Sequence, residues 1–314
     1  MDAREAAAAL VAGVERVGRH GIALPLADGG EGTLDALCPT PADRRVARVT
    51  GPLGDPVEAE WGVREDTAVV EMARASGLAL VPANDPVRAT TRGTGELIRA
   101  ALEAGLRRVI VAVGGSATTD GGLGALEVLE FDLRDAEVLV ACDVSTSFVD
   151  AARIFGPQKG ATASDLGALE NRLQRLAEGY LSETGVDVRH LRGAGAAGGL
   201  AGGLAAYGAR LVPGAALVAG VAGLGAVLER ASLVLTGEGR LDASSFAGKV
   251  VGHVLAESSA ASVPAWVIAG DVVRSEIPAG ARALSLVERS GSSARAHASA
   301  AALLAEAAAE LAAR

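Results

Sequence analysis

The sequence predicts an α/β fold in which helices cover a parallel, doubly wound sheet. Short apolar segments rich in β-branched residues alternate along the chain with helix-like segments, and glycine-rich loops follow several of the strands. The composition agrees with this prediction. Half of the 314 residues are hydrophobic, with alanine the dominant type, and only 3% are aromatic. Such small residues suit helices packed closely on a sheet, whereas a β-sandwich core would be richer in aromatic side chains.

The first third of the chain is predicted to begin with an amphipathic helix. Residues 2–18 carry alanine and valine on one face and Arg4, Glu15 and Arg16 on the other. Five elements should follow: a strand at 22–26, a short helix that ends at Leu37, a hairpin at 46–63 around a long turn, a strand at 68–72 and a helix at 96–104 with Thr94 as its cap.

The remaining two thirds continue the alternation of strands and helices. Two buried strands are predicted at 109–113 and 138–141, and a helix of about fifteen residues with Thr162 or Ser164 as its cap comes later. A regular βα pattern begins at residue 233. It comprises strands at 233–235, 263–270 and 283–287, a helix near Lys249 and a closing helix at 294–314.

Charge and cysteine content narrow the classes of function. The formal charge of −9 and the pI near 5.1 argue against a nucleic acid as partner. Cys38 and Cys142 stand far apart, which predicts neither a disulfide framework nor a zinc site and indicates a reducing compartment. The charged N-terminus is not typical of a signal peptide. The uncharged segment 211–228 contains Pro213 and four glycines, so we expect packed core there rather than a membrane span, and a cytoplasmic protein.

A glycine-rich loop after the predicted strand at 109–113 is the strongest candidate for a binding site. The glycines are interleaved with oxygen-bearing side chains: Gly114, Gly115, Gly121, Gly122 and Gly124 with Ser116, Thr118, Thr119 and Asp120. Such a loop can bring backbone N–H groups and hydroxyls close to a phosphate or a small acid. The alternative is a tight strand-to-helix turn that needs glycine only for its backbone angles.

Carboxylates at predicted loop positions are the second group of candidates. Asp28 and Glu31 follow the predicted strand at 22–26, where α/β folds collect ligand groups, although Asp28 could instead cap a helix. Asp143, Glu238 and Asp242 also lie in loops. The histidines are isolated, and no HExxH motif, Cys–His cluster or Ser–His–Asp order occurs. Magnesium-assisted phosphoryl transfer fits these residues better than hydrolysis, and the lack of a GxxxxGK[ST] motif excludes a P-loop kinase.

The two lysines stand out because the other 27 of the 29 basic residues are arginine. Lys159 and Lys249 both adjoin glycine at predicted loop-to-helix junctions, where a compact ammonium suits phosphate neutralisation. Chance placement is the alternative. Gly193-x-Gly195-x-x-Gly198 matches a dinucleotide fingerprint in letters, but only a weak strand precedes it and no acidic residue follows at the expected spacing. Close backbone packing, or a second oxyanion-binding turn, is favoured over an NAD-dependent oxidoreductase.

Seven stretches in order resemble the type I glycerate kinases, and Gly248-Lys249 adds an eighth. They are Ala27-Asp-Gly-Gly-Glu-Gly-Thr33, Val49-Thr-Gly-Pro-Leu-Gly54, Thr91-Arg-Gly-Thr-Gly-Glu-Leu-Ile98, Gly114-Gly-Ser-Ala-Thr-Thr-Asp-Gly-Gly122, Phe155-Gly-Pro-Gln-Lys-Gly-Ala161, Gly193-Ala-Gly-Ala-Ala-Gly-Gly199 and Leu235-Thr-Gly-Glu-Gly-Arg-Leu-Asp242. The resemblance covers nearly the whole chain.

The resemblance implies two α/β domains with the active site in the cleft between them. Residues 1–43 and 230–314 would form a Rossmann-like domain with a parallel sheet, and 44–229 an inserted domain with a mixed sheet. The implied reaction transfers the γ-phosphoryl of ATP to a hydroxyl of D-glycerate with Mg²⁺. A small-molecule substrate, neither nucleic acid nor membrane, would be the partner, and a homodimer is allowed.

The chemistry of this reaction, in which one part of the site binds a carboxylate and another a polyphosphate, predicts roles for the candidate residues. The catalytic residues would be Asp143, Lys159 and Asp28, with Asp143 best placed to orient or deprotonate the hydroxyl, and Glu31 and Asp28 would hold magnesium. Substrate and phosphate would be bound by Gly114, Gly115, Ser116, Thr118, Thr119, Asp120, Arg92, Gln158, Gly195, Glu238, Arg240 and Lys249.

Two departures from the family pattern carry expectations of their own. The family begins with a strand and a loop of Asp-Ser-Phe-Lys-Gly type, and this sequence begins at the helix that follows, so we expect a third lysine and one central strand to be missing from it. Asp143 is followed by Val-Ser-Thr-Ser147 where the family commonly has Asn-Pro. A rival hypothesis is therefore a ligand-binding remnant of the fold without catalytic activity.

Overall fold

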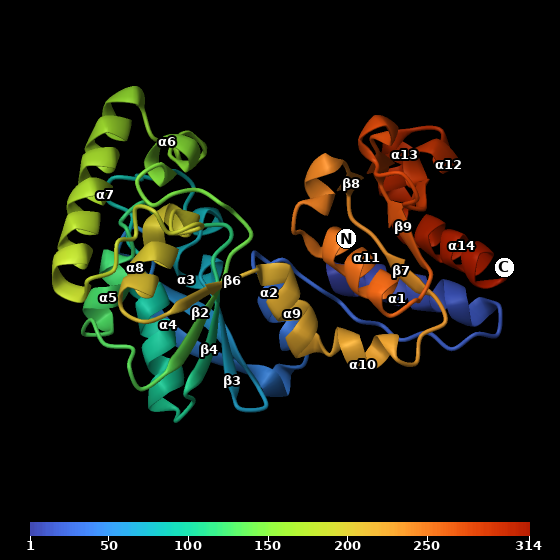
Figure 1. The fold of residues 1–314 in the computed structure, drawn as a ribbon, viewed down its shortest axis with the longest axis horizontal. Coiled ribbons are helices and arrows are strands. Elements are labelled where there is room, and N and C mark those ends of the chain that lie inside the picture. Colours follow the sequence, from blue (N-terminus) through green and yellow to red (C-terminus); the bar gives the residue numbers. More distant parts are fainter. The chain divides into compact units, whose positions relative to one another are not determined.

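A six-stranded mixed sheet organises residues 28–217 of the computed structural model, which describes the whole chain from Met1 to Arg314 (Figure 1). The strand order follows the sequence: β1 (Arg44–Thr50), β2 (Pro56–Arg64), β3 (Thr67–Glu71), β4 (Arg108–Ala112), β5 (Glu137–Ala141) and β6 (Arg210–Val212). Strands β1, β2 and β3 pair antiparallel, and β3 to β6 pair parallel. The predicted hairpin at 46–63 is confirmed as β1 and β2.

Burial along the strands explains this order. β3 is fully buried, and β4 and β5 are buried after their first residue, as expected for central strands covered on both faces. β1 is an edge strand in which Arg45, Val46 and Arg48 are exposed. Charged side chains on an edge strand oppose pairing with another chain.

Eight helices belong to this unit or begin in it. They are α2 (Thr33–Leu37), α3 (Ala73–Ser76), α4 (Arg92–Glu103), α5 (Leu123–Val128), α6 (Ala151–Phe155), α7 (Ala163–Thr184), α8 (Leu200–Ala206) and α9 (Gly214–Ala222). The longest, α7, is closed at both ends by sequence signals. Thr162 caps its first turn in a capping box with Asp165, and Gly185 ends it in the left-handed conformation.

The second unit comprises residues 1–27 and 218–314 and has a smaller, fully parallel sheet. β7 (Val234–Thr236), β9 (Ala265–Ala269) and β11 (Ala283–Ser285) pair in the order β11-β9-β7, and β8 (Arg240–Leu241) pairs with β10 (Asp271–Val272). The remaining helices are α1 (Ala3–Arg16), α10 (Leu224–Leu228), α11 (Val250–Ala260), α12 (Leu286–Ser290), α13 (Ser293–Ala298) and α14 (Ala300–Ala312). α1 packs tightly on α14, since a Cβ added at Gly13 would lie 2.1 Å from the Ala305 carbonyl oxygen.

Some predicted elements differ in the structure. Residues 22–26 form no strand, because Pro25 has no N–H to donate and the side chains of Leu24 and Leu26 pack instead with Leu224, Leu228 and Val254. The closing helix divides at Ser299 into α13 and α14.

Further differences concern helix ends and unit boundaries. Helix α4 begins at Arg92, so Thr94 lies inside it and donates its hydroxyl to Ser76 Oγ rather than capping the helix. Helix α7 has 22 residues, longer than predicted. The boundaries between the units fall at 27/28 and 217/218, so residues 28–43 pack with the large sheet and not with the parallel one. None of the helices is both long and apolar enough to span a membrane.

Candidate functional site

The glycine-rich loop leaves the carboxyl end of β4 and lies beside the segment Asp28–Glu31. The N–H of Val113 donates to the Gly29 carbonyl at 2.9 Å, which joins the two segments. A Cβ at Gly114 would lie 2.5 Å from the Gly30 Cα, so glycine is required by this close approach. The structure therefore brings together two motifs that are separated by about eighty residues in the sequence, at the sheet edge where parallel α/β folds bind ligands.

Five carbonyl groups of the loop are bound from within the protein. Leu78 N–H donates to the Gly115 carbonyl at 2.8 Å, and Asn84 Nδ2 donates to the Ala117 carbonyl at 2.8 Å. Three more bonds complete the set: Lys159 Nζ to the Thr118 carbonyl at 2.6 Å, Leu123 N–H to the Asp120 carbonyl at 3.2 Å and Tyr180 Oη to the Gly121 carbonyl at 3.1 Å.

Most N–H groups of the same loop are not bound, the exceptions being those of Ala117, Gly121 and Gly122. Those of Gly114, Gly115, Ser116, Thr118, Thr119 and Asp120 donate no hydrogen bond within the protein. The Thr119 side chain is fully buried, and its Oγ1 also has no partner. Unpaired buried polar groups are rare in folded proteins, so each one indicates a ligand or an ordered water. A loop with bound carbonyls and unpaired N–H groups is suited to an anion.

Asp120 points into the protein rather than toward a ligand. The residue is 7% exposed, and its carboxylate accepts four hydrogen bonds: from Thr91 N–H at 2.7 Å, Thr91 Oγ1 at 2.9 Å, Gly122 N–H at 3.2 Å and Gly124 N–H at 3.3 Å. It thereby binds the first turns of α4 and α5 to the loop. The predicted ligand contact of Asp120 stays a prediction, and the contacts that the structure provides are structural.

Asp28 and Glu31 remain available for a ligand or a cation. Only Oδ1 of Asp28 has a partner, the Gly30 N–H at 3.2 Å. Glu31 is exposed and lies against the loop, since a Cβ at Gly115 would lie 2.0 Å from its Oε1. The structure contains no cluster of three or more His, Cys, Asp or Glu side chains that could hold a metal. Magnesium is commonly held by one or two protein carboxylates together with substrate phosphates. Asp28 and Glu31 could provide the two carboxylates.

Lys159 is buried behind the loop. The residue is 3% exposed, and its Nζ is directed at the Thr118 carbonyl. Burial lowers the pKa of this ammonium to about 7, and the nearby charge of Asp120 opposes the shift. The predicted contact of Lys159 with a transferred phosphoryl group therefore stays a prediction, and the bond that the structure provides is to the backbone of the loop.

Asp143, the predicted base, caps a helix. Its Oδ1 accepts from Gly214 N–H at 2.7 Å and its Oδ2 from Ala215 N–H at 3.1 Å, at the start of α9. The role of Asp143 in deprotonation stays a prediction.

The segment Gly193–Gly199 packs against the loop and is fully buried. A Cβ at Gly195 would lie 2.2 Å from the Ser147 carbonyl oxygen, and one at Gly198 would lie 2.0 Å from the Thr118 carbonyl oxygen. Gly121 N–H donates to the Gly198 carbonyl at 3.0 Å. These distances support close backbone packing, favoured over a dinucleotide fingerprint.

Two further predicted residues lie near this region with exposed side chains. Arg92 is at the start of α4 and forms an ion pair with Glu96 at 3.3 Å, while Gln158 precedes Lys159. Glu96 also accepts from the backbone N–H of Thr50 at 2.6 Å, so the Glu96 carboxylate links α4 to β1. Neither Arg92 nor Gln158 makes a hydrogen bond to the loop.

The second unit carries its own group of predicted residues after β7. Arg240 is exposed and forms an ion pair with Asp242 at 3.8 Å, and the hydrogen bond from Ser244 lowers the pKa of Asp242. Lys249 is exposed at the N-cap of α11 and donates to Ser244 Oγ at 3.1 Å. Glu238 is half-buried, and its carbonyl accepts from Gly270 N–H at 3.1 Å. Two cations beside the unpaired N–H groups of a helix N-terminus suit a phosphate chain.

Sequence reasoning missed several residues that shape the loop. Asn84, Thr91 and Tyr180 bind it from segments 33, 29 and 59 positions away. Thr91 belongs to a family-like stretch but had no predicted role, and no local motif marks Asn84 or Tyr180. Glu71 is 2% exposed and accepts from Gly32 and Leu34 N–H at 3.0 and 3.1 Å, which fixes the start of α2 beside the loop. Burial raises its pKa. An acidic residue closing an otherwise apolar strand was the only signal for it.

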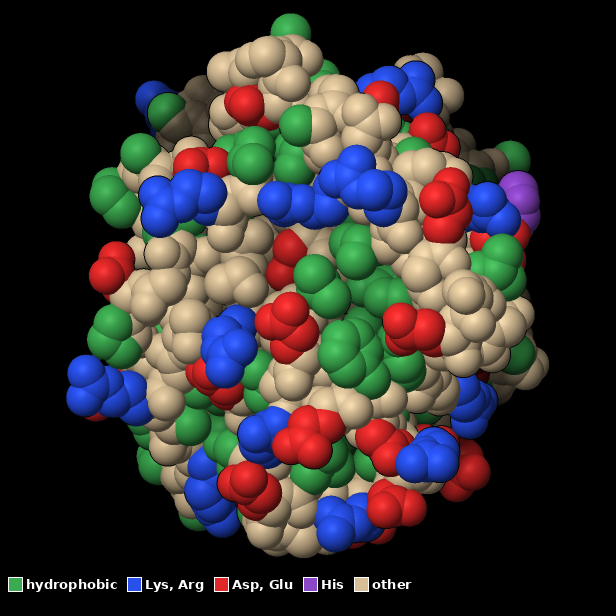
Figure 2. All heavy atoms as spheres, turned by 90° about the vertical axis from the view of Figure 1, so that its left-hand side faces the viewer, with side chains coloured by type: hydrophobic (Ala, Val, Ile, Leu, Met, Phe, Trp, Pro, Cys, Tyr) green, Lys and Arg blue, Asp and Glu red, His purple; other side chains and the backbone are tan.

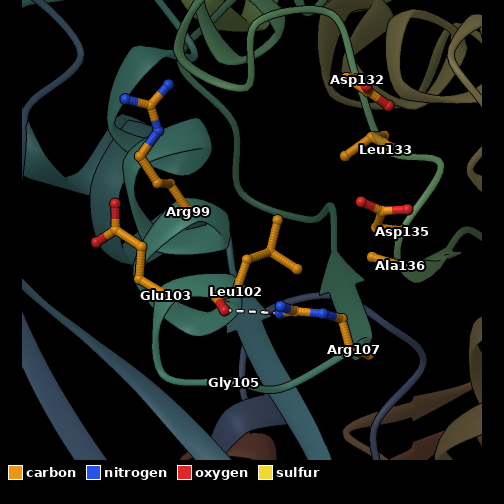
Figure 3. Close-up of a pocket in the computed structure, with 9 residues that line it drawn as sticks. All are labelled: Arg99, Leu102, Glu103, Gly105, Arg107, Asp132, Leu133, Asp135 and Ala136. Carbon is orange, nitrogen blue, oxygen red and sulfur yellow. Dashed lines mark hydrogen bonds between the residues drawn. The ribbon is translucent and has the colours of Figure 1, made fainter.

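The hollow drawn in Figure 3 is separate from this loop. It has a volume of about 450 Å³ and lies at the amino ends of β4 and β5, between Arg99, Leu102 and Glu103 of α4 and the segment Asp132–Ala136. Arg107 Nη1 donates to the Leu102 carbonyl at 2.7 Å (Figure 3). Ligands of parallel α/β sheets bind at the opposite, carboxyl ends. On the face shown in Figure 2, basic and acidic side chains alternate and form no large basic field.

Comparisons with known proteins agree on one family. The model of the glycerate kinase family matches residues 1–138 and 129–314. The glycerate 2-kinase of Escherichia coli (strain K12) is 43% identical over 268 residues, which cover 73% of this chain and 70% of that protein. The glycerate kinase of Bacillus subtilis (strain 168) is 39% identical over 315 residues, with 87% and 82% covered. The crystal structure of a glycerate kinase 2 from Salmonella typhimurium LT2 aligns with a TM-score of 0.82 at 33% identity, covering 99% of this chain and 93% of that one.

Proposed function

Because the chain belongs to the glycerate kinase family, we propose that it transfers the γ-phosphoryl group of ATP to a hydroxyl of D-glycerate, giving phosphoglycerate. The observation that carries this proposal is the set of unpaired N–H groups in the loop Gly114–Asp120. These N–H groups can bind a small anion, and no exposed cation takes part. The carboxylates of Asp28 and Glu31 lie beside them and can accept hydrogen bonds from the hydroxyl groups of a substrate.

The loop is suited to the carboxylate of glycerate rather than to a phosphate chain. Glu31 lies against Gly115, and Asp28 lies beside Gly30, so a polyphosphate at this position would meet two like charges wherever no cation lies between them. A molecule with one negative charge and adjacent hydroxyls avoids that repulsion. Its carboxylate would accept from the loop N–H groups, and its hydroxyls would donate to Asp28 and Glu31.

The phosphates of ATP are assigned in this proposal to the second unit. Arg240 and Lys249 are exposed cations, and Lys249 stands at the first turn of α11. Charge-assisted hydrogen bonds from such side chains, together with unpaired N–H groups at a helix N-terminus, are the usual means of binding phosphate.

Asp28 is the proposed proton acceptor. One of its two carboxylate oxygens has no partner, whereas both oxygens of Asp143 accept from α9. In the reaction the substrate hydroxyl oxygen attacks the γ-phosphorus, its proton passes to Asp28, and the bond to the ADP oxygen breaks. Asp28 and Glu31 are also the residues that would hold Mg²⁺, which neutralises phosphate charge when bound.

A coupled assay tests the function. With the protein, MgATP and D-glycerate, ADP release should require both substrates, and ³¹P NMR should show a phosphate monoester of glycerate. The name of the E. coli relative makes the 2-hydroxyl the first to examine. Lactate, which lacks the 3-hydroxyl, is a suitable control for recognition of the second hydroxyl. Binding of D-glycerate and ATP without any turnover would instead support the ligand-binding remnant.

Such a substrate pair also determines the expected location. ATP and a free hydroxy acid are cytoplasmic metabolites, so we place the protein in the cytoplasm, where fractionation of the source cells tests it. A homodimer is allowed by the sequence but does not follow from the substrates, and analytical ultracentrifugation measures the mass directly.

A further inference from the structure

Two side chains behind the loop, the half-buried Asn84 and the buried Lys159, have no role in the proposed reaction steps. Asn84 lies between Pro82 and Pro86, which restrict the backbone around it, and its Nδ2 donates to both the Ala117 and the Lys159 carbonyls, at 2.8 and 2.9 Å. Lys159 Nζ donates to the Thr118 carbonyl at 2.6 Å. Asn84 thus binds the loop and the backbone of Lys159 at the same time.

The geometry of the peptide bond connects these contacts to the N–H groups. In a planar trans peptide the C=O and N–H point in opposite directions, so fixing one fixes the other. The Ala117 carbonyl shares its peptide with the N–H of Thr118, and the Thr118 carbonyl shares its peptide with the N–H of Thr119. Asn84 and Lys159 therefore determine the direction of two of the unpaired N–H groups.

The loop needs such contacts because its glycines allow other conformations. Gly115 and Gly121 have φ values of +70° and +67° and flank the segment Ser116–Asp120, so the segment between them can change its path and turn a carbonyl to where an N–H now lies. A carbonyl facing the anion would repel it. Side-chain donors on the buried carbonyls oppose that rotation.

We propose that Asn84 and Lys159 are positioning residues, which orient the N–H groups of Thr118 and Thr119 toward a bound carboxylate. The orientation itself follows from the contacts described above, and only the identity of the anion as glycerate rests on the proposed function. Lys159 acts through the backbone in this proposal and not by touching phosphate.

Tyr180 supplies a matched control. Its Oη donates to the Gly121 carbonyl at 3.1 Å, and the N–H in that peptide, that of Gly122, is already bound to Asp120. The Tyr180 ring is held by Phe148 and Tyr207, with centroids 6.1 and 5.8 Å away, so Tyr180→Phe keeps the packing and removes only the hydroxyl. This variant loses a buried bond to the same loop without affecting an unpaired N–H.

The test compares Asn84→Leu, Lys159→Met and Tyr180→Phe in steady-state kinetics. In the first two, KM for D-glycerate should rise about three- to tenfold, as expected for the loss of one oriented hydrogen bond, while KM for ATP stays within about twofold. Tyr180→Phe should lower the thermal midpoint but leave both KM values within about twofold. The proposal would be overturned if Asn84→Leu had the same KM for D-glycerate as the wild type. It would also be overturned if Tyr180→Phe raised this KM as much as Asn84→Leu and Lys159→Met do.

Hydrogen–deuterium exchange of peptides covering 113–122 gives a measurement that needs no substrate. Asn84→Leu and Lys159→Met should speed exchange in this loop several-fold, and Tyr207→Phe, whose hydroxyl binds Glu183 and not the loop, should leave it unchanged. If the two variants exchange faster but the wild-type protein does not turn over glycerate, the proposed function is overturned and the orienting role is retained. Unchanged exchange in Asn84→Leu would overturn the orienting role alone.

Discussion

The two units offer different kinds of groups to an anion. In residues 28–217 the donors are backbone N–H groups of a loop whose threonines are fully buried, and the only lysine nearby is buried behind it. In the other unit the donors are side chains, with Arg240 66% exposed and Lys249 also exposed. Backbone donors depend on the shape of the loop, so packing controls them. Exposed cations depend on charge and salt, and their geometry is not restricted by the core.

This contrast predicts where substitution is most damaging. The largest effect is expected for Gly198→Ala, since a Cβ there would lie 2.0 Å from the Thr118 carbonyl oxygen and the residue has φ +64°. We expect the free energy of unfolding to fall by about 2–4 kcal/mol and glycerate-dependent activity to be lost. Urea denaturation with a parallel activity assay measures both.

Gly167→Ala is the matched control for that variant. Gly167 lies inside α7, and a Cβ there would have no atom within 4 Å. Alanine should therefore raise the free energy of unfolding by about 0.5–1 kcal/mol. If Gly198→Ala were as stable and active as Gly167→Ala, the loop would not depend on close packing.

The next effect concerns pH and distinguishes the buried lysine from the exposed one. Burial lowers the pKa of Lys159 from 10.5 to about 7. Between these values the unfolded chain binds a proton that the folded chain does not, so this group makes the free energy of unfolding rise with pH from about 7 to about 10.5. Lys159→Met should lack that rise, and the wild type should gain stability relative to it across this window.

Denaturation midpoints at pH 6, 8 and 9.5 check this expectation. Lys249→Met, which removes an exposed lysine, is the control. Parallel pH profiles for the wild type and Lys159→Met would mean that the folded protein does not disfavour the charged form of Lys159.

A smaller and different effect is expected for Lys249. Lys249→Met should raise KM for ATP about tenfold, since a charge-assisted bond to phosphate is lost, and leave the thermal midpoint unchanged. Arg230→Met removes another exposed cation of the same unit and should change neither quantity. Higher salt should weaken ATP binding in the wild type more than in Lys249→Met. An unaltered KM for ATP would remove Lys249 from the phosphate site.

The sequence was sufficient to predict what depends on local pattern. The apolar run at 109–113 and the glycines after it predicted β4 and its loop, and the turn at 51–55 predicted the β1–β2 hairpin. The prediction of a strand at 22–26 was wrong, and it shows what a local pattern cannot predict. A strand also needs a neighbouring strand to pair with, and residues distant in the sequence decide whether one is present. The direction of the Lys159 ammonium depends on its bond to the Thr118 carbonyl, 41 positions away in the sequence. The direction of the Tyr180 hydroxyl depends on its bond to the Gly121 carbonyl, 59 positions away. Neither is encoded in a motif.

The smallest expected effect, that of Asp143→Asn, decides which carboxylate accepts the proton. Both oxygens of Asp143 accept from the first N–H groups of α9, at 2.7 and 3.1 Å, so the asparagine should weaken this cap and lower the free energy of unfolding by about 0.5–1.5 kcal/mol. If capping is its main role, kcat with D-glycerate should stay within about threefold of the wild type. Asp28→Asn is the comparison, because a base contributes about 10²- to 10⁴-fold to the rate and its loss should appear in kcat. A hundredfold fall in kcat for Asp143→Asn, with Asp28→Asn near the wild type, would show that a carboxylate bound to a helix N-terminus is the base.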